Sequence, residues 1–203
     1  MRAQLFSSKI NSTKSNLEIA IEWQSILSPD LQKQITATHL ASFLDLYLPY
    51  TEQQLGLKPE LSKEEWLTKM IQDELHEVKQ GKLFLATAHA QDKLVGFIMC
   101  APSKARHENL KVDVYISLLA VKPIRDFKSK NKIRIGLGQQ LVESAEARFT
   151  DANTLTLDTR YINQSAMAFY EKIGFNATGT RTFGGSNPKH YLGLEKPTKS
   201  FSP

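Results

Sequence analysis

Two glycines at the start of an expected helix could help to bind a phosphate group. Gly136 and Gly138 follow Arg134, and the apolar residues from Leu137 to Phe149 recur at helical spacing. The first turn of a helix exposes unpaired backbone N–H groups and a partial positive charge, which together attract anions. Glycine has no Cβ, so the backbone at these positions can come close to a diphosphate. The sequence therefore predicts an anion site at the start of this helix.

The same glycines could begin a dinucleotide-binding fingerprint, because Asp158 lies about 20 residues further along the chain. Two features argue against this alternative. Leu141 stands where the fingerprint has a third small residue. Fourteen residues separate Gly136 from Val121, the end of the preceding expected strand, whereas the fingerprint has a tight turn at that place.

Several other kinds of catalytic centre lack a necessary residue. His76-Glu77 begins the H-E-x-x-H pattern of zinc proteases, but Gln80 replaces the second histidine. The five histidines are scattered and no cysteine and histidine spacing fits a zinc site, so the sequence predicts no metal. Cys100 lies in an apolar segment, which favours a buried thiol over a nucleophile. No G-x-S-x-G nucleophile motif is present.

Basic residues are concentrated in the segment that precedes the two glycines. Asp126 is the one acidic residue among six basic ones, which are Lys122, Arg125, Lys128, Lys130, Lys132 and Arg134. A solvated loop and a phosphate-binding loop are both compatible with this pattern. Nucleic acid is disfavoured as a partner, because Phe127 is the single aromatic residue in this segment and the net charge of +5 is mild for 203 residues.

The periodicity of the apolar residues predicts the elements that hold these residues. Spacing of three and four favours a helix from Pro29 to about Leu48. A second helix is expected behind Ser62, which has the S-x-x-E spacing of a capping box with Glu65. The expected strands are Leu17–Trp23, Leu83–Ala90, Leu94–Ala101, Val112–Val121, Leu155–Leu157, Phe175–Phe183 and His190–Leu194, and further helices begin at Leu137 and span Asn163–Ile173. This order predicts one mixed α/β sheet.

Length and composition fit a single domain. The chain is 41% apolar and 23% charged, which is sufficient for one sizeable core. We expect that domain over residues 17–195, with a flexible tail at 1–16 and a short tail at 196–203. No segment approaches the roughly 18 apolar residues of a membrane helix, and the N-terminus lacks the apolar core of a signal peptide. The single cysteine leaves no internal disulfide, so we expect a cytoplasmic protein.

Three blocks of the sequence have the order and spacing of a known family. Residues 115–123 read YISLLAVKP and residues 134–141 read RIGLGQQL. Residues 163–175 match the pattern N-x-x-A-x-x-x-Y-E-K-x-G-F at seven positions. These blocks resemble the acyl-CoA-binding and helical motifs of the GNAT superfamily of acyl-CoA-dependent N-acyltransferases. Over residues 17–194, the resemblance implies one α+β domain with a mixed, mostly antiparallel sheet of about seven strands flanked by about four helices.

The resemblance implies that two segments bind acetyl-CoA through their backbone. Leu119, Ala120 and Val121, at the end of the central strand, would bind the pantetheine arm. The residues that would wrap the diphosphate are Arg134, Ile135, Gly136, Leu137, Gly138 and Gln139.

The third block would complete the site. By the same resemblance Asn163 and Ala166 would contact the cofactor, and the phenol of Tyr170 would reach the thioester sulfur. From the residues alone, Asn163 also fits the N-cap of a helix and Tyr170 fits a core aromatic.

The chain departs from the family at two places. The loop before Gly136 is longer, and Ile133 stands where the family has glutamine or arginine, with Arg134 one place later. Tyr115 stands at the strand position where several members carry a catalytic glutamate. The general base is therefore left open among Asp113, Tyr115 and ordered water.

The implied activity is direct transfer of the acetyl group of acetyl-CoA to a primary amine of a small molecule or a protein. A base removes a proton from the amine, the Leu119 N–H stabilises the oxyanion, and the Tyr170 phenol protonates the leaving thiolate. The alternative is a catalytically inactive CoA-binding sensor or interaction module, because the glutamate is missing. Polyamine, amino acid, antibiotic and protein lysine all stay open as acceptors, a homodimer is left open, and no membrane partner is expected.

Overall fold

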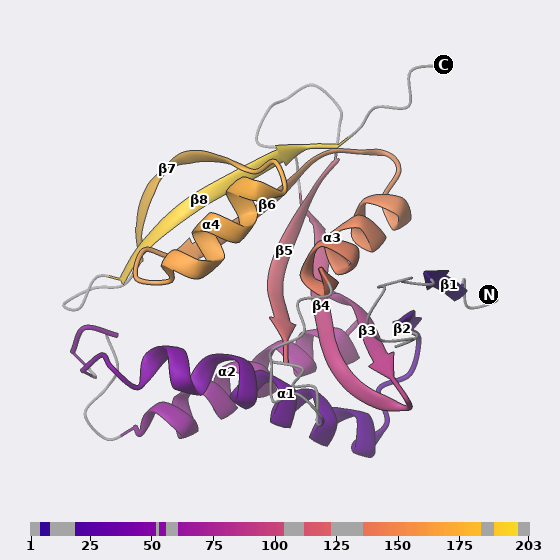
Figure 1. Ribbon diagram of the computed structural model, residues 1–203, viewed down its shortest axis with the longest axis horizontal. Coiled ribbons are helices and arrows are strands. Elements are labelled where there is room, and N and C mark those ends of the chain that lie inside the picture. Colours follow the sequence, from indigo (N-terminus) through magenta and orange to yellow (C-terminus); the bar gives the residue numbers. More distant parts are fainter. Residues whose placement is uncertain are drawn as a thin grey trace, which may run out of the picture.

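The computed structural model describes residues 5–8, 19–51, 53–55, 61–103, 112–122, 136–183 and 189–198. Within these residues, eight strands form one sheet and four helices lie on its two faces (Figure 1). The strands are β1 (Leu5–Ser8), β2 (Ile19–Gln24), β3 (Phe84–Ala90), β4 (Lys93–Ser103), β5 (Val112–Val121), β6 (Ala152–Arg160), β7 (Asn176–Phe183) and β8 (Lys189–Pro197). The helices are α1 (Pro29–Tyr47), α2 (Lys63–Lys79), α3 (Leu137–Arg148) and α4 (Gln164–Lys172).

The strands lie in the order β1-β2-β3-β4-β5-β6-β8-β7. Neighbouring strands are antiparallel except β5 and β6, which run parallel. The prediction of a mixed, mostly antiparallel sheet is therefore confirmed. One strand comes in addition to those expected, because Leu5–Ser8 pairs with β2 inside the segment 1–16 that we expected to be a tail.

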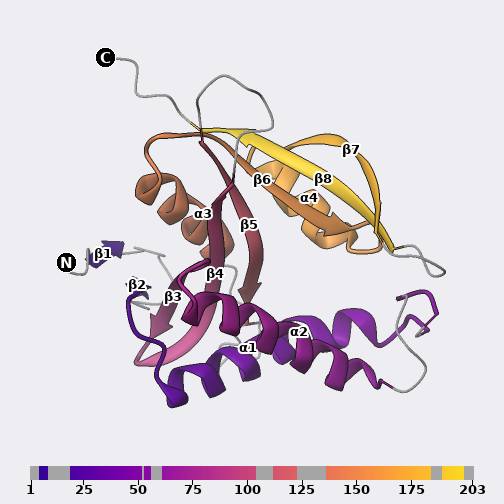
Figure 2. The same ribbon diagram turned by 180° about the vertical axis from the view of Figure 1, so that it is seen from behind.

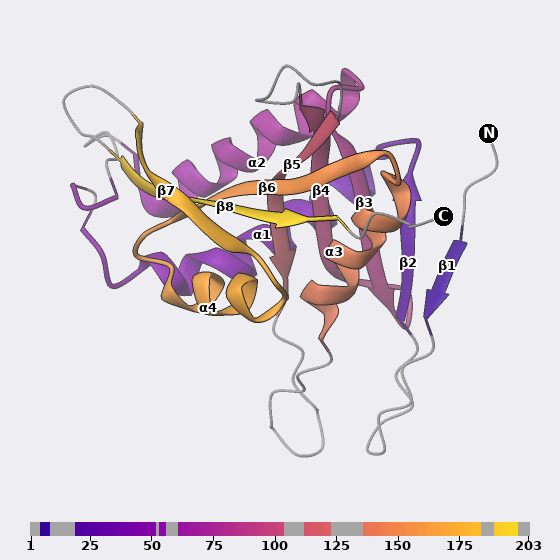
Figure 3. The same ribbon diagram turned by 90° about the horizontal axis from the view of Figure 1, so that it is seen from above.

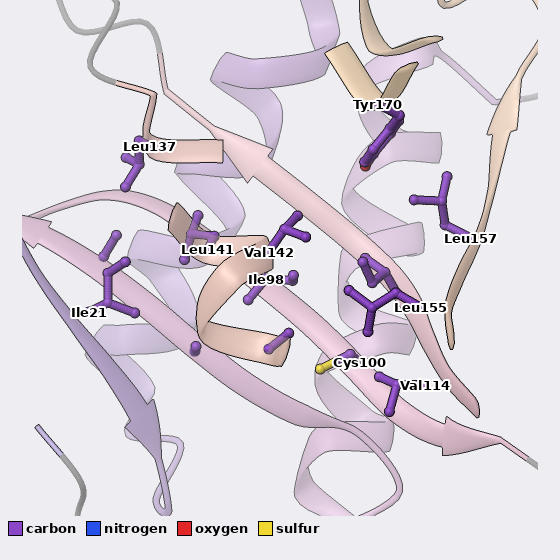
Figure 4. Close-up of a cluster of buried hydrophobic side chains, with 14 of the residues drawn as sticks. Ile21, Ile98, Cys100, Val114, Leu137, Leu141, Val142, Leu155, Leu157 and Tyr170 are labelled. Atoms are coloured by element: carbon purple, nitrogen blue, oxygen red, sulfur yellow. The ribbon is translucent and has the colours of Figure 1, made fainter. Parts of the chain in front are cut away.

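The helices divide between the two faces of the sheet. α3 and α4 lie in front of the strands in Figure 1, whereas α1 and α2 lie in front when the molecule is seen from behind in Figure 2. Within β4, Ile98 and Cys100 belong to a main core with α3, while Phe97 and Met99 belong to a second core with α1 and α2. This alternation is what a strand covered on both faces requires. Figure 4 shows part of the main core between α3, α4 and the strands.

Local signals in the sequence set the ends of the helices. The Ser62 side chain accepts a hydrogen bond from the backbone N–H of Glu65, and the Glu65 carboxylate accepts one from the backbone N–H of Ser62, so the predicted capping box is confirmed. Ser28 caps α1 in a similar way and is followed by Pro29, whose missing N–H costs nothing at this position. No helix in the described residues is long and apolar enough to cross a membrane.

Candidate functional site

The sheet opens between its two central strands. The parallel pairing of β5 with β6 runs from Val112 to Ile116 on β5 and ends with Ile116 opposite Leu157. Beyond that point β6 continues along β8, and residues 117–121 of β5 continue along β4 alone among the described residues. Figures 1 and 3 show the two strands separating into a V, with β8 and β7 on the β6 arm. The end of β5 is therefore an open sheet edge in the middle of the molecule.

A β-bulge at Ser117 marks the place where the strands separate. Leu118 pairs with Met99 and Ile116 pairs with Cys100, so Ser117 is one extra residue on β5. A bulge breaks the alternation of side chains and re-aims those beside it. Ser117 accordingly faces α2, as Leu118 does, although the two are adjacent in the chain.

The backbone of β5 presents two residues to the opening. The N–H of Lys122 donates to the carbonyl of Val95 at 2.8 Å, so the polar groups of Ala120, two residues earlier, also face β4. By the same alternation, the N–H and C=O groups of Leu119 and Val121 face the open edge. Ala120 itself is buried in the second core, with 1% of its surface exposed. Of the three expected pantetheine-binding residues, two thus have their backbone groups toward the opening.

The start of α3 lies beside this strand end because Gly96 of β4 allows close packing. A Cβ on Gly96 would lie 3.0 Å from the carbonyl oxygen of Ala120 and 3.3 Å from side-chain carbons of Leu137 and Leu141. Glycine therefore lets the first turns of α3 approach the β4 backbone more closely than any other residue would allow.

The first turn of α3 presents backbone rather than side chains. Gly136 is the N-cap residue in the left-handed region, at φ 65°, and it provides no side-chain cap. The Leu137 side chain is buried in the main core, whereas Gln139 is exposed and donates to the Glu143 carboxylate at 2.8 Å. Arg134 and Ile135, with most of the basic segment, lie outside the described residues. The N–H groups of this turn can therefore meet an anion from outside the helix.

Asn163 is the N-cap of α4. Its Oδ1 accepts from the backbone N–H of Ala166 at 3.1 Å and from the Ser165 hydroxyl at 3.0 Å, and the residue is 7% exposed. The alternative that Asn163 is an N-cap residue is therefore confirmed. Its side-chain oxygen Oδ1 already accepts two hydrogen bonds from within the protein. Ala166 is half-buried and packs against the main core.

Tyr170 lies between aromatic rings on the side of α4 that faces the sheet. Its ring centroid is 5.0 Å from that of Phe169 and 5.3 Å from that of Phe175. The phenol runs from α4 toward β5 (Figure 4). Burial, with a smaller effect of Tyr115 on β5, raises the pKa of the Tyr170 phenol above its ordinary value of 10.0, so this hydroxyl stays protonated at neutral pH. Tyr170 is thus a buried core aromatic whose protonated hydroxyl points toward the central strand.

Of the other predicted residues, Asp113 lies at the start of β5 and accepts a hydrogen bond from Thr154 of β6. Cys100 is buried, as predicted, and burial raises the pKa of its thiol to about 12. Among the described residues, no group of His, Cys, Asp or Glu side chains could hold a metal ion.

One carboxylate at the opening was missed by the sequence reasoning. Glu74 of α2 accepts a hydrogen bond from the Ser117 hydroxyl, with 2.6 Å between the oxygens. Burial raises the pKa of this carboxyl. A signal was present in the sequence, because Glu74 follows Leu67 and Ile71 at the spacing of seven and three that marks the apolar face of α2.

Comparison with known proteins identifies the fold. No curated protein matches the chain in sequence. The structure is similar to that of the PaiA N-acetyltransferase of Thermoplasma acidophilum in complex with coenzyme A, with a TM-score of 0.59 and 18% identity over 87% of this chain and 98% of that one. It is also similar to aminoglycoside 6'-acetyltransferase type Ii, with a TM-score of 0.58 and 18% identity over 88% and 96% of the two chains.

A third similar structure is the NatC complex bound to Gag peptide and CoA, with a TM-score of 0.54 and 18% identity over 88% of this chain and 98% of that chain. At these identities the likeness shows the fold. The family itself is shown by sequence, since the model of the acetyltransferase (GNAT) domain matches residues 48–185, which is more than half of the chain. The protein therefore belongs to the GNAT acetyltransferase domain family.

Proposed function

We propose that this protein is an N-acetyltransferase, which moves the acetyl group of acetyl-CoA to a primary amine of a small molecule or a protein. The observation that carries the proposal is the open edge of β5, which ends beside the uncapped first turn of α3. The backbone N–H and C=O groups of the half-buried Leu119 and Val121 need hydrogen-bond partners, so this edge favours a ligand with amide groups. Pantetheine supplies such groups.

The residues at the site fit acetyl-CoA in three ways. The backbone of Leu119 and Val121 can pair with the pantetheine amides. The N–H groups of residues 137–139 and the positive end of the α3 dipole can hold the diphosphate. Asn163 orders the start of α4, which carries Tyr170. We further propose that residues 17–195 form the acetyltransferase domain and that the protein works in the cytoplasm, which suits its single cysteine.

The chain's own groups can perform the chemistry that this transfer needs. Acetyl-CoA supplies an activated acyl group as a thioester. The Leu119 N–H can donate a hydrogen bond to the carbonyl oxygen as negative charge develops on it. The Tyr170 hydroxyl can give its proton to the leaving sulfur, because its raised pKa keeps it protonated.

The names of the similar structures mention acceptors of different kinds. One is an aminoglycoside acetyltransferase and another was determined with a peptide. Both kinds of acceptor carry amines, so the proposal extends to a primary amine without choosing between them.

The proposal is tested by measuring CoA binding and acetyl transfer. CoA at 100 times its dissociation constant should stabilise the protein by about 2.7 kcal/mol, seen as a rise in Tm and confirmed by calorimetry. Transfer to a panel of amines should release a thiol that a colorimetric reagent detects. Binding without transfer to any amine would favour the inactive CoA-binding module, and no binding at millimolar CoA would overturn the acetyltransferase proposal.

A charge variant tests the position of the diphosphate. Gln139→Glu adds a negative charge at the start of α3 and should weaken CoA binding about tenfold. The charge is favourable at the positive end of the helix dipole, but it replaces the hydrogen bond to Glu143 by repulsion between two carboxylates, so Tm should change little. Ala147→Glu places the same charge at the other end of α3 and should leave CoA affinity unchanged. Equal affinities of the two variants would place the phosphates elsewhere.

A further inference from the structure

We propose that Glu74 accepts the proton of the amine substrate, and that this substrate is therefore an amine that is positively charged at neutral pH. The inference rests on the proposed acetyl transfer and adds to it the proton acceptor that the sequence left open. It begins from the hydrogen bond that joins Glu74 of α2 to Ser117 of the central strand.

The contact lies at the point where the sheet opens. Ser117 is the bulged residue of β5, immediately after Ile116, the last residue that pairs with β6. Its hydroxyl donates to Oε2 of Glu74 at 2.6 Å. The carboxylate keeps further acceptor positions, because one hydrogen bond uses one of about four lone-pair sites. Glu74 can therefore accept from Ser117 and from a substrate nitrogen at the same time.

Glu74 reaches the opening from the face of the sheet opposite to α3 and α4. α2 packs on the face of the second core, whereas Leu137 and Tyr170 belong to the main core on the other face. A cofactor held by α3 and α4 would leave the α2 side of the opening for the acceptor. A carboxylate on that side would attract a cationic amine and orient its nitrogen toward the thioester.

The surroundings of Glu74 suit a proton acceptor. The carboxyl lies one residue before the buried Leu75 and three after the buried Ile71. Burial is the largest influence on its pKa and raises it, with smaller contributions in the same direction from Glu77 and Asp73 of the same helix. The hydrogen bond from Ser117 on β5 acts in the opposite direction. Among the described residues, no lysine or arginine lowers the pKa of Glu74.

The two protein groups that the sequence offered as bases are engaged elsewhere. Asp113 accepts from Thr154 at the closed end of the β5–β6 pair. Tyr115 lies close enough to Tyr170 to raise its pKa, and a phenol is a poor base at neutral pH because it is itself protonated. Glu74 is thus a carboxylate that contacts the central strand at the open end of the β5–β6 pair.

The transfer balances with Glu74 as acceptor. The ammonium nitrogen gives one proton to the carboxylate, which becomes a neutral acid. The freed lone pair forms the N–C bond to the carbonyl carbon of the thioester, and the C–S bond breaks with its electron pair on sulfur. The Tyr170 hydroxyl gives its proton to the sulfur and takes the second proton of the nitrogen in its place, which leaves the amide, the CoA thiol and a restored phenol. Glu74 then returns its proton to water.

The test compares Glu74→Gln with Glu64→Gln, which changes an exposed carboxylate in the first turn of the same helix. The acceptors are the best alkyl amine among spermidine, an aminoglycoside and a short peptide, together with hydroxylamine, which is mostly neutral at pH 7. Glu74→Gln should lower kcat/KM for the alkyl amine at least about 100-fold and change transfer to hydroxylamine by less than about threefold. Its dissociation constant for CoA should not change, and Glu64→Gln should have the kcat/KM of the native protein.

Ser117→Ala provides a second measurement, the pH profile of kcat/KM. This profile would not change if the contact between Ser117 and Glu74 were purely structural. It removes the interaction that lowers the pKa of Glu74, so the acidic limb of the kcat/KM profile should shift to higher pH while activity persists. If Glu74→Gln has a lowered Tm, Glu74→Asp retains a carboxylate and should keep the acidic limb.

Two results would overturn the assignment. One is native kcat/KM for the alkyl amine in Glu74→Gln across the pH range, and the other is an unshifted acidic limb in Ser117→Ala. Both presuppose a native protein that transfers acetyl groups. A native protein that binds no CoA or acetylates no amine would instead overturn the proposed function.

Discussion

Gly138, in the first turn of α3, lies directly against the ring of Phe169 in α4. A Cβ at Gly138 would be 3.0 Å from Cζ and 3.3 Å from Cε2 of that ring. The contact joins the two helices that, together with their N-cap residues, carry seven of the twelve predicted acetyl-CoA residues. Glycine at this position therefore has a packing reason in addition to the phosphate-binding reason that its place at a helix start suggests.

Gly138→Ala should lower the free energy of unfolding by about 1 kcal/mol. Alanine favours a helix over glycine by about 0.8–1.0 kcal/mol, but overpacking costs about 1–3 kcal/mol. The Phe169 ring has little freedom to move, because Tyr170 lies beside it at a centroid distance of 5.0 Å. Urea denaturation measures the change.

The control for this prediction removes the ring. In a Phe169→Leu background, Gly138→Ala should become neutral or stabilising, because the helix preference remains and the close contact is lost. The same destabilisation in both backgrounds would assign the effect to the backbone of α3 and not to the contact with α4.

The predicted fold followed from signals that act over a few residues. The Ser62–Glu65 capping box depends on near neighbours and is present. β6 was expected over Leu155–Leu157 and extends over Ala152–Arg160, since its flanking residues are polar and gain their strand pairing from β8. β1 was not expected, because the segment around Leu5–Ser8 has no periodic apolar pattern and is ordered by pairing with β2.

The candidate site could be predicted where the motifs are contiguous. Asn163 and Tyr170 lie in one block of sequence, which folds as predicted into helix α4 and its N-cap. The pair of Glu74 and Ser117 could not be predicted, because 43 residues separate them and their contact depends on a bulge in β5. Pairings of this kind arise from packing between elements, which the local sequence does not specify.

Stability should fall as the pH falls from 6.5 to about 4, through protonation of His39. This residue of α1 is fully buried, both ring nitrogens lack a hydrogen-bond partner within the described chain, and burial lowers its pKa from 6.5 to about 4. Between these two pH values, the unfolded chain therefore binds a proton at His39 that the folded chain does not bind. The loss approaches about 3 kcal/mol below pH 4, at 1.36 kcal/mol per pKa unit.

His39→Leu should remove this part of the pH dependence, as measured by urea denaturation at pH 7, 5.5 and 4.5. His76→Leu is the matched control, because His76 is exposed on α2 and should leave the slope unchanged. A slope that is identical in the native protein and in His39→Leu would mean that other groups cause the acid sensitivity.

Arg160→Lys should destabilise the protein by about 2 kcal/mol. The guanidinium is 4.8 Å from the ring centroid of Trp66 and 5.6 Å from those of Tyr47 and Tyr191, and it donates to the Leu55 carbonyl at 3.1 Å. A desolvated cation over aromatic rings is worth about 2 kcal/mol, and an ammonium group cannot stack as a planar guanidinium does.

Arg148→Lys is the matched control for Arg160. Arg148 also stacks on an aromatic ring, at 4.6 Å from the centroid of Trp23, but it is exposed. The expected loss is about 0.5–1 kcal/mol, the range for exposed cation–π contacts. Thermal unfolding of both variants measures the difference, and equal losses would show that burial adds nothing to the Arg160 cluster.

Tyr170→Phe should reduce kcat at least about tenfold, which corresponds to about 1.4 kcal/mol of barrier. The substitution keeps the ring and its contacts with Phe169 and Phe175, so Tm should change little. The Michaelis constant for acetyl-CoA should move less than kcat, because the hydroxyl acts mainly as charge develops on sulfur.

Tyr47→Phe is the control, since Tyr47 is also buried, with a pKa raised to about 12, and lies against Arg160 away from α4. Full turnover in Tyr170→Phe, with chemistry shown to limit the rate, would assign the proton transfer to water and leave Tyr170 as a packing residue.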